Sequence, residues 1–269
     1  MIAVLPLLQI SAGLIGLYGA ITAAQWLVDM SQWRDGRALG WDLQSLRRGR
    51  LARSRAVALV SAPPGLTLVA VVQLGVSLEL LFMPGTAALI GLLGCFLVTE
   101  LLLSLRSGAD GGDKIVAVAA SGALLQAIGL QFEAQRFVLA GILWSGGQLT
   151  LAYFASGASK LGLVPWRNGQ ALRAALTSYM WGHRWAAAVV RHASAARLLA
   201  WAIILLELAF PLALLLPVPW LCGVLGLFLL FHLAIAVVMG LNHYPWAFAA
   251  TYPAVVLLGQ WLRAGLGIG

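Results

Sequence analysis

Lys160 is the residue of this sequence whose type and position most directly suggest chemistry. It is the first charged residue after Arg136 and stands where a long apolar run ends. Tyr153, Gly157 and Lys160 follow the spacing i, i+4 and i+7, so in a helix they share one face. Tyr153 offers a hydroxyl on that face, and Gly157 lets another helix come close. A lysine held there, partly out of water, has its charged form disfavoured and can act as a general base.

The same lysine also fits a purely structural role. At the end of a membrane helix, lysine commonly extends its ammonium group to the lipid headgroups. The spacing around Lys160 leaves both interpretations open.

Four further ionisable side chains lie inside apolar runs: Glu79, Glu100, Glu207 and His232. Near the centre of a bilayer each costs at least about 2–3 kcal/mol unless it faces the protein interior or water. Such residues are therefore expected to face inward. The alternative is that they hold helices together, at about 1 kcal/mol each.

Glu207 and His232 are predicted to lie at equal depth on neighbouring antiparallel helices, because a short turn at 217–219 joins the two runs. At a rise of about 1.5 Å per residue, both lie about 12–14 Å from the same end. A direct contact in a polar pocket is therefore expected, and Pro211 adds to it by leaving the carbonyl of Glu207 without its helical partner. His232 is the one histidine placed inside a run, which argues against haem and its paired ligands. No metal site is predicted.

The composition is that of a membrane protein. Of the 269 residues 61% are hydrophobic and only 10% are charged, whereas soluble domains have about 25% charged residues. Runs of about 20 apolar residues, each long enough to cross a bilayer, fill most of the chain. We predict an all-α, polytopic bundle of about eight membrane helices that forms a single domain over residues 1–269. The candidate spans are 4–28, 64–83, 86–105, 115–131, 137–159, 198–216, 218–240 and 246–263.

Basic residues gather in two connecting segments, 31–55 and 160–197, which contain thirteen of the 17 Lys and Arg residues. Eight spans put both segments on one side, and the positive-inside rule makes that side cytoplasmic. The net charge of +8 is explained in this way and predicts no nucleic-acid partner. Within the second segment, 169–196 is too polar to cross and is expected to be either an amphipathic interfacial helix or an ordinary basic loop.

The stretch YFASGASKLGLVPWRNGQAL, which begins at Tyr153, resembles the signature of the horizontally transferred transmembrane (HTTM) domain. That family includes the vitamin K-dependent γ-glutamyl carboxylases. The resemblance is strongest over 100–260, and three other features agree in order: GADGGDK before the fourth span, Glu207 with Pro211, and Phe231-His232. The residues of the signature itself are Tyr153-Phe154, Ser156-Gly157, Lys160-Leu161, Trp166 and Asn168-Gly169.

The resemblance implies a lipid substrate and assigns roles to particular residues. In the carboxylases, the lysine that matches Lys160 deprotonates vitamin K hydroquinone. The resemblance therefore implies a quinone or hydroquinone as cofactor, with Lys160, Glu207 and His232 as catalytic residues. The residues expected to line the substrate site are Tyr153, Gly157, Trp166 and Asp113.

The sequence also departs from the carboxylases. Their Asn-His pair falls at Gly112-Asp113, and their large soluble substrate domain has no counterpart here. Positive-inside charge also places Lys160 at the cytoplasmic face, whereas carboxylation occurs on the lumenal side.

Two functions from different classes stay open at this stage. The first is a bacterial inner-membrane enzyme with quinone-dependent, carboxylase- or epoxidase-like chemistry acting on a membrane lipid. The second is a non-catalytic subunit that anchors a membrane or redox protein partner. A transporter is disfavoured, because the sequence has no convincing internal repeat.

Overall fold

The computed structural model describes residues 4–33, 41, 55–107, 109–179 and 182–268, and they form a helical bundle without strands. Seven of these helices are long and apolar enough to cross a membrane. Leucines and valines on their outer faces are exposed, as expected for contact with lipid, among them Leu68, Leu101, Leu205 and Leu230. The chain is an integral, multi-pass membrane protein, as its composition predicts.

Five long helices come first along the chain. They are α1 (Val4–Val28, continued by the 3₁₀ turn η1, Asp29–Trp33), α4 (Pro63–Leu80), α5 (Thr86–Ser107), α6 (Gly111–Gln131) and α7 (Gln135–Gly162). A short helix, α3 (Arg55–Ser61), precedes α4. Helix α6 begins four residues before the predicted span, because Asp110 and Asp113 form a reciprocal capping box that starts it.

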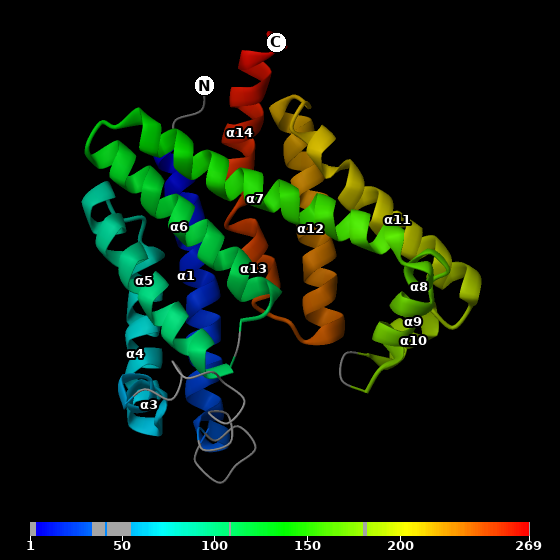
Figure 1. Ribbon diagram of the computed structural model, residues 1–269, viewed down its shortest axis with the longest axis horizontal. Helices are drawn as coiled ribbons and strands as arrows, with labels where there is room; N and C mark the ends of the chain where they lie inside the picture. Colours follow the sequence, from blue (N-terminus) through cyan, green and yellow to red (C-terminus); the bar gives the residue numbers. More distant parts are fainter. Residues whose placement is uncertain (1–3, 34–40, 42–54, 108, 180–181, 269) are drawn as a thin grey trace.

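The second half of the chain adds two more long helices, α11 (Ala193–Ala213) and α12 (Val218–Met239). Between α7 and α11 lie three short helices: α8 (Val164–Arg167), α9 (Gln170–Thr177) and α10 (Arg184–Val189). The segment 169–196, expected as one amphipathic helix or a loop, thus holds two short helices and the first turn of α11. Figure 1 shows α11 and α12 joined at one end and spreading apart toward α8–α10.

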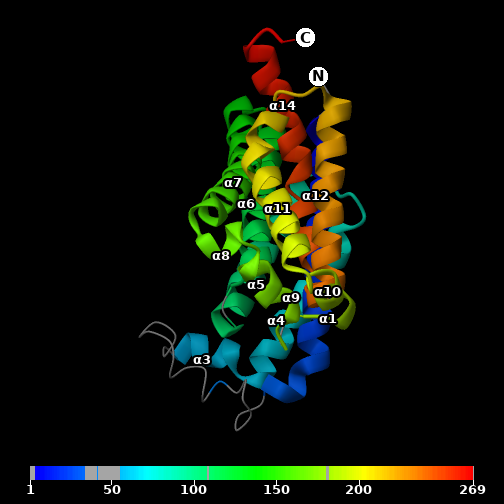
Figure 2. The same cartoon turned by 90° about the vertical axis from the view of Figure 1, so that its right-hand side faces the viewer.

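The eighth predicted span, 246–263, is not one continuous helix. It is divided into α13 (Tyr244–Ala249) and α14 (Tyr252–Gly265). Pro253 causes the break, because it has no N–H to bond the carbonyl of Ala249 and its ring clashes with that turn. The two pieces follow one another through the bundle, and both ends of the chain lie at the same end of it (Figures 1 and 2).

The two larger buried apolar clusters both include residues of α6, and a smaller third one contains Leu66, Val69 and Leu103. One of the two larger clusters contains residues of α1, α4, α5, α6 and α13, centred on Ile15, Phe96 and Ala120. The other contains residues of α6, α7, α11, α12 and α14, centred on Leu149, Phe210 and Phe228. Each half of the bundle also holds one group of buried polar side chains.

Candidate functional site: a buried ion pair beside an apolar cavity

Lys160 forms an ion pair with Glu207 between α7 and α11. Its Nζ lies 2.8 and 2.6 Å from the two carboxylate oxygens and 2.5 Å from Oγ of Ser156. The side chains are only 16% and 6% exposed. Lys160 therefore does not extend away from the bundle as a headgroup anchor would. It is held in place by two hydrogen bonds to the buried Glu207 and one to the partly buried Ser156.

Gly157 makes this contact possible. A Cβ atom added there would lie 2.8 Å from the backbone nitrogen of Leu208 and 3.0 Å from Cβ of Glu207. Both distances are shorter than ordinary van der Waals contact, so a side chain at this position would push α11 away from α7. The expectation that Gly157 admits another helix is confirmed, and that helix is the one carrying Glu207.

Trp166 on α8 completes the surroundings of the lysine. Nζ of Lys160 lies 5.2 Å from the centre of the indole ring, within the range of a cation–π interaction. Helix α8 is tied to α11, because Nε1 of Trp201 donates to the carbonyl of Arg167 at 3.0 Å. The turn after α7 thus folds back over the ion pair.

His232 pairs with Tyr153 rather than with Glu207. Its Nε2 lies 2.9 Å from the Tyr153 hydroxyl, and its ring stacks on Phe248 at a centroid distance of 3.8 Å. The predicted contact between Glu207 and His232 is therefore wrong. The close approach of α7 at Gly157 gives Glu207 a cationic partner on that helix instead. Nδ1 of His232 is buried without a hydrogen-bond partner among the described residues.

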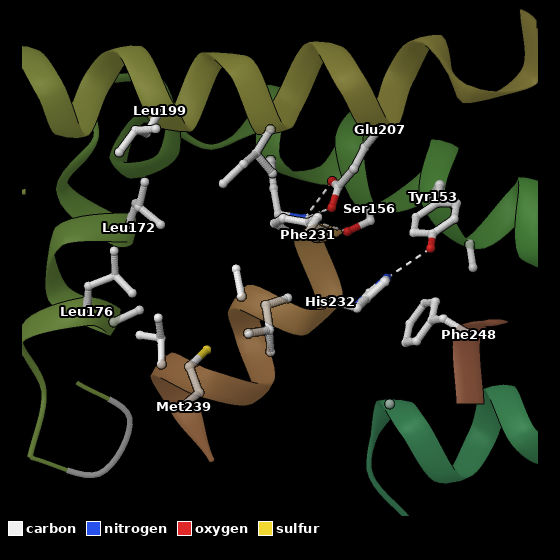
Figure 3. Close-up of a pocket in the computed structure, with 18 of the residues that line it drawn as sticks. Tyr153, Ser156, Leu172, Leu176, Leu199, Glu207, Phe231, His232, Met239 and Phe248 are labelled. Carbon is white, nitrogen blue, oxygen red and sulfur yellow. Dashed lines mark hydrogen bonds and ion pairs between the residues drawn. The ribbon is translucent and has the colours of Figure 1, made fainter. Parts of the chain in front are cut away.

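Both polar pairs lie on the wall of one cavity of about 960 Å³. Figure 3 shows the Ser156–Glu207 group and the Tyr153–His232 pair projecting toward the same space, with leucines and Met239 around the rest of it. Its lining residues come from α6 to α13, among them α9, α10, α11 and α12. Its apolar lining includes Leu172, Leu176, Val189, Leu199, Ile203, Phe231, Ile235 and Met239.

Asp113 lies elsewhere, in a second and polar cavity of about 300 Å³ on the other side of the first turn of α6. Tyr18, Glu100, Asp110 and His243 line the same cavity. The neighbours of Asp113 on that turn, Gly111 and Lys114, face the large cavity instead. The expected site residues thus divide between two cavities: Tyr153, Lys160, Trp166, Glu207 and His232 line the first, and Asp113 the second.

Asp110 lines the polar cavity and comes directly before the membrane helix α6. Burial by itself would raise its pKa. Hydrogen bonds from His243 and from the backbone N–H of Asp113 outweigh this effect, so the pKa of Asp110 lies below its ordinary value.

Sequence reasoning missed Ser156 and most of the polar cavity. Ser156 precedes Lys160 by four residues, a spacing that places two side chains side by side on a helix, so the signal was present. Glu100 was expected to face the interior and does so, whereas the same expectation is wrong for Glu79, which is exposed on α4. The neighbours of Glu100, Tyr18 and Gln73, are distant in sequence, and no local pattern joins them.

No family model, curated protein or solved structure matches this chain. The likeness to the HTTM domain therefore rests on the motifs in the sequence.

Proposed function

We propose that this chain is a vitamin K-dependent γ-carboxylase-like (HTTM) protein of a bacterial inner membrane, whose large cavity binds a quinone or another isoprenoid lipid. In this proposal Lys160 is the base that takes a proton from the hydroxyl of the bound lipid. The single observation that carries it is the Lys160–Glu207 ion pair, which is buried on the wall of an otherwise apolar cavity.

The cavity suits a lipid with one polar group. Its volume of about 960 Å³ is at the upper end of the range for small-molecule sites. Because the lining is apolar, a hydrocarbon tail would be buried favourably, at about 25 cal/mol per Å². The Tyr153–His232 pair is a second polar point on the wall, to which a lipid oxygen could hydrogen-bond.

The ion pair supplies a route for a proton. An ammonium group has no lone pair, so Lys160 becomes a base only after it has given a proton to a neighbour. Oε2 of Glu207 lies 2.6 Å from Nζ and can receive that proton. The neutral amine then accepts a proton from a lipid hydroxyl, while Ser156 and the Trp166 ring hold the amine in place. Charge is conserved, because the lipid anion forms beside the restored ammonium group.

Extraction of the purified protein with organic solvent, followed by mass spectrometry for isoprenoid quinones, tests this proposal. Ala152 lines the cavity, whereas Ala155, one turn further along the same helix, is exposed and does not line it. We expect wild type and Ala155→Phe to retain a bound quinone. Ala152→Phe should lose it, because the ring fills the space that the lipid needs.

Equal quinone content in the two phenylalanine variants would show that the lipid adheres to the outside and would refute the proposal. A wild-type protein without extractable lipid, even after incubation with added quinone, would also refute it. That result would favour the non-catalytic anchoring function.

A further inference from the structure

We propose that the polar cavity bordered by α1, α5, α6 and His243 binds one divalent transition-metal ion, with Asp110, Asp113 and His243 as ligands. This inference does not rest on the proposed lipid chemistry, because the metal ligands line a different cavity. No metal site was predicted from the sequence, because His243 is far from the two aspartates along the chain and the aspartates belong to a helix cap.

The three side chains already converge. One ligand atom from each lies within 4.8 Å of the others. Nε2 of His243 is 3.0 Å from Oδ2 of Asp110. Two ligands that each lie about 2.1 Å from an ion, at right angles to one another, are about 3.0 Å apart. The observed separation therefore accommodates an ion as well as a hydrogen bond.

Capping of α6 explains the hydrogen bonds of only one oxygen in each of the two aspartate carboxylates. Oδ1 of Asp110 accepts from the backbone N–H of Asp113 at 3.0 Å, and Oδ2 of Asp113 accepts from that of Asp110 at 2.8 Å. Each aspartate thus uses one oxygen for the cap. The other oxygen of each is directed to a side chain of the cavity, His243 for Asp110 and Tyr18 for Asp113. A cap alone does not require this second set of contacts.

Counting hydrogens at Tyr18 shows that one hydrogen-bond donor is missing. Its hydroxyl lies 2.5 Å from Oδ1 of Asp113 and 3.2 Å from Oε1 of Glu100, but it has only one hydrogen to donate. The shorter contact takes that hydrogen. Oε1 of Glu100 then faces lone pairs of the phenol oxygen, and no other hydrogen bond to it is found among the described residues.

Glu100 is held in this position from its other side. Thr99 donates to the carbonyl oxygen of Gln73, which orients the amide so that Nε2 of Gln73 donates to Oε2 of Glu100 at 3.2 Å. Glu100 is only 7% exposed, so water cannot readily supply the missing donor. A buried carboxylate oxygen without a donor is costly, and a cation in the adjoining cavity would compensate for it.

The charges around the cavity point the same way. Four carboxylates line it (Asp29, Glu100, Asp110 and Asp113), and among the described residues no lysine or arginine does. Two carboxylates with one imidazole form a ligand set for Mn²⁺, Fe²⁺ or Zn²⁺. Ca²⁺ and Mg²⁺ prefer oxygen ligands alone and should bind more weakly.

Titration of the chelator-treated protein in detergent with Mn²⁺, followed by the electron paramagnetic resonance signal of the free ion, tests the site. We expect one saturable Mn²⁺ per chain. His243→Gln should lower the affinity at least about tenfold. Its amide can still donate to Asp110, so the fold is preserved while a good transition-metal ligand is lost. Glu79→Gln is the matched control, because this carboxylate is exposed on α4 outside the cavity, and its affinity should equal that of wild type.

Glu100→Gln gives an independent measurement. The amide of the introduced glutamine can donate a hydrogen bond to the Tyr18 oxygen. In the presence of chelator this variant should therefore melt at or above the wild-type temperature. The rise in melting temperature that Mn²⁺ gives wild type should shrink in this variant. The absence of saturable Mn²⁺ binding to wild type would overturn the proposal. Binding that neither His243→Gln nor Glu100→Gln weakens would identify an adventitious ion only, and would overturn it as well.

Discussion

Lys160 and Glu207 are joined through both carboxylate oxygens, at 2.8 and 2.6 Å, although 47 residues separate them in sequence. The pair links α7 to α11 beside Gly157, where the two backbones come close together. Stability, insertion and the proposed proton transfer therefore depend on the same contact, and each can be tested separately.

Removing one partner of this pair should destabilise the protein far more than removing both. Lys160→Met or Glu207→Met leaves an uncompensated buried charge, which costs about 3–5 kcal/mol. The double variant has no unpaired charge, so the free energies of unfolding should show a coupling of roughly 0.5–3 kcal/mol. The measurement is a double-mutant cycle on thermal unfolding in detergent. A cycle with Glu207→Met and His232→Leu should give a smaller coupling, since those residues have different partners. Additive effects for Lys160 and Glu207 would contradict the observed geometry.

A methyl group at Gly157 should separate the two helices. Gly157→Ala places Cβ 2.8 Å from the nitrogen of Leu208 and 3.0 Å from Cβ of Glu207, so α11 must shift. Gly147 is the matched control on the same helix, because nothing lies within 4 Å of its added Cβ. We expect Gly157→Ala to lower the melting temperature. Gly147→Ala should leave it unchanged or raise it, in keeping with the better helix propensity of alanine, about 1 kcal/mol. Equal behaviour of the two variants would show that the approach at Gly157 is not a tight one.

Both basic segments should face the cytoplasm. Tags inserted in 31–55 and 160–197 are expected to report the cytoplasmic side, and tags at the two ends of this chain the opposite side. The bundle agrees with this arrangement, since both ends of the chain lie at one end of it and η1, α3 and α8–α10 lie toward the other (Figure 1). Residues 34–40 and 42–54 of the first segment lie outside the described residues. Reporters that place the two ends on opposite sides would require an odd number of crossings and would refute the topology.

Composition and periodicity predicted the class of fold well, because a long apolar run has few alternatives to a membrane helix. The prediction failed where a single residue interrupts a run. Pro253 breaks the eighth segment, yet hydropathy averaged over a window does not register one missing N–H. The early start of α6 was likewise missed, since the capping box lies in a polar stretch that an apolar count excludes.

Five of the expected site residues line one cavity, but the contacts between them were not predicted. Depth along a helix follows from the sequence, and it correctly placed Glu207 and His232 in the interior. Rotation about the helix axis decides which neighbour each one meets, and that depends on packing at Gly157 and on Phe248. The polar cavity joins α1, α5 and α6 with His243, so its residues come from segments that no local spacing relates.

Replacement of Lys160 by arginine distinguishes a base from an anchor. Arginine keeps the positive charge, can pair with both oxygens of Glu207 and counts equally for topology, but it does not give up its proton at ordinary pH. We therefore expect Lys160→Arg to insert, express and melt nearly as wild type does, while Lys160→Ala is less stable. If Lys160 is the base, both variants should lose activity to the same extent. The readout is the consumption in air of the hydroquinone form of whichever quinone is extracted from the protein, followed by its absorbance and corrected for the rate without protein. Full activity of the arginine variant would leave Lys160 as a structural partner of Glu207 and refute its role as the base.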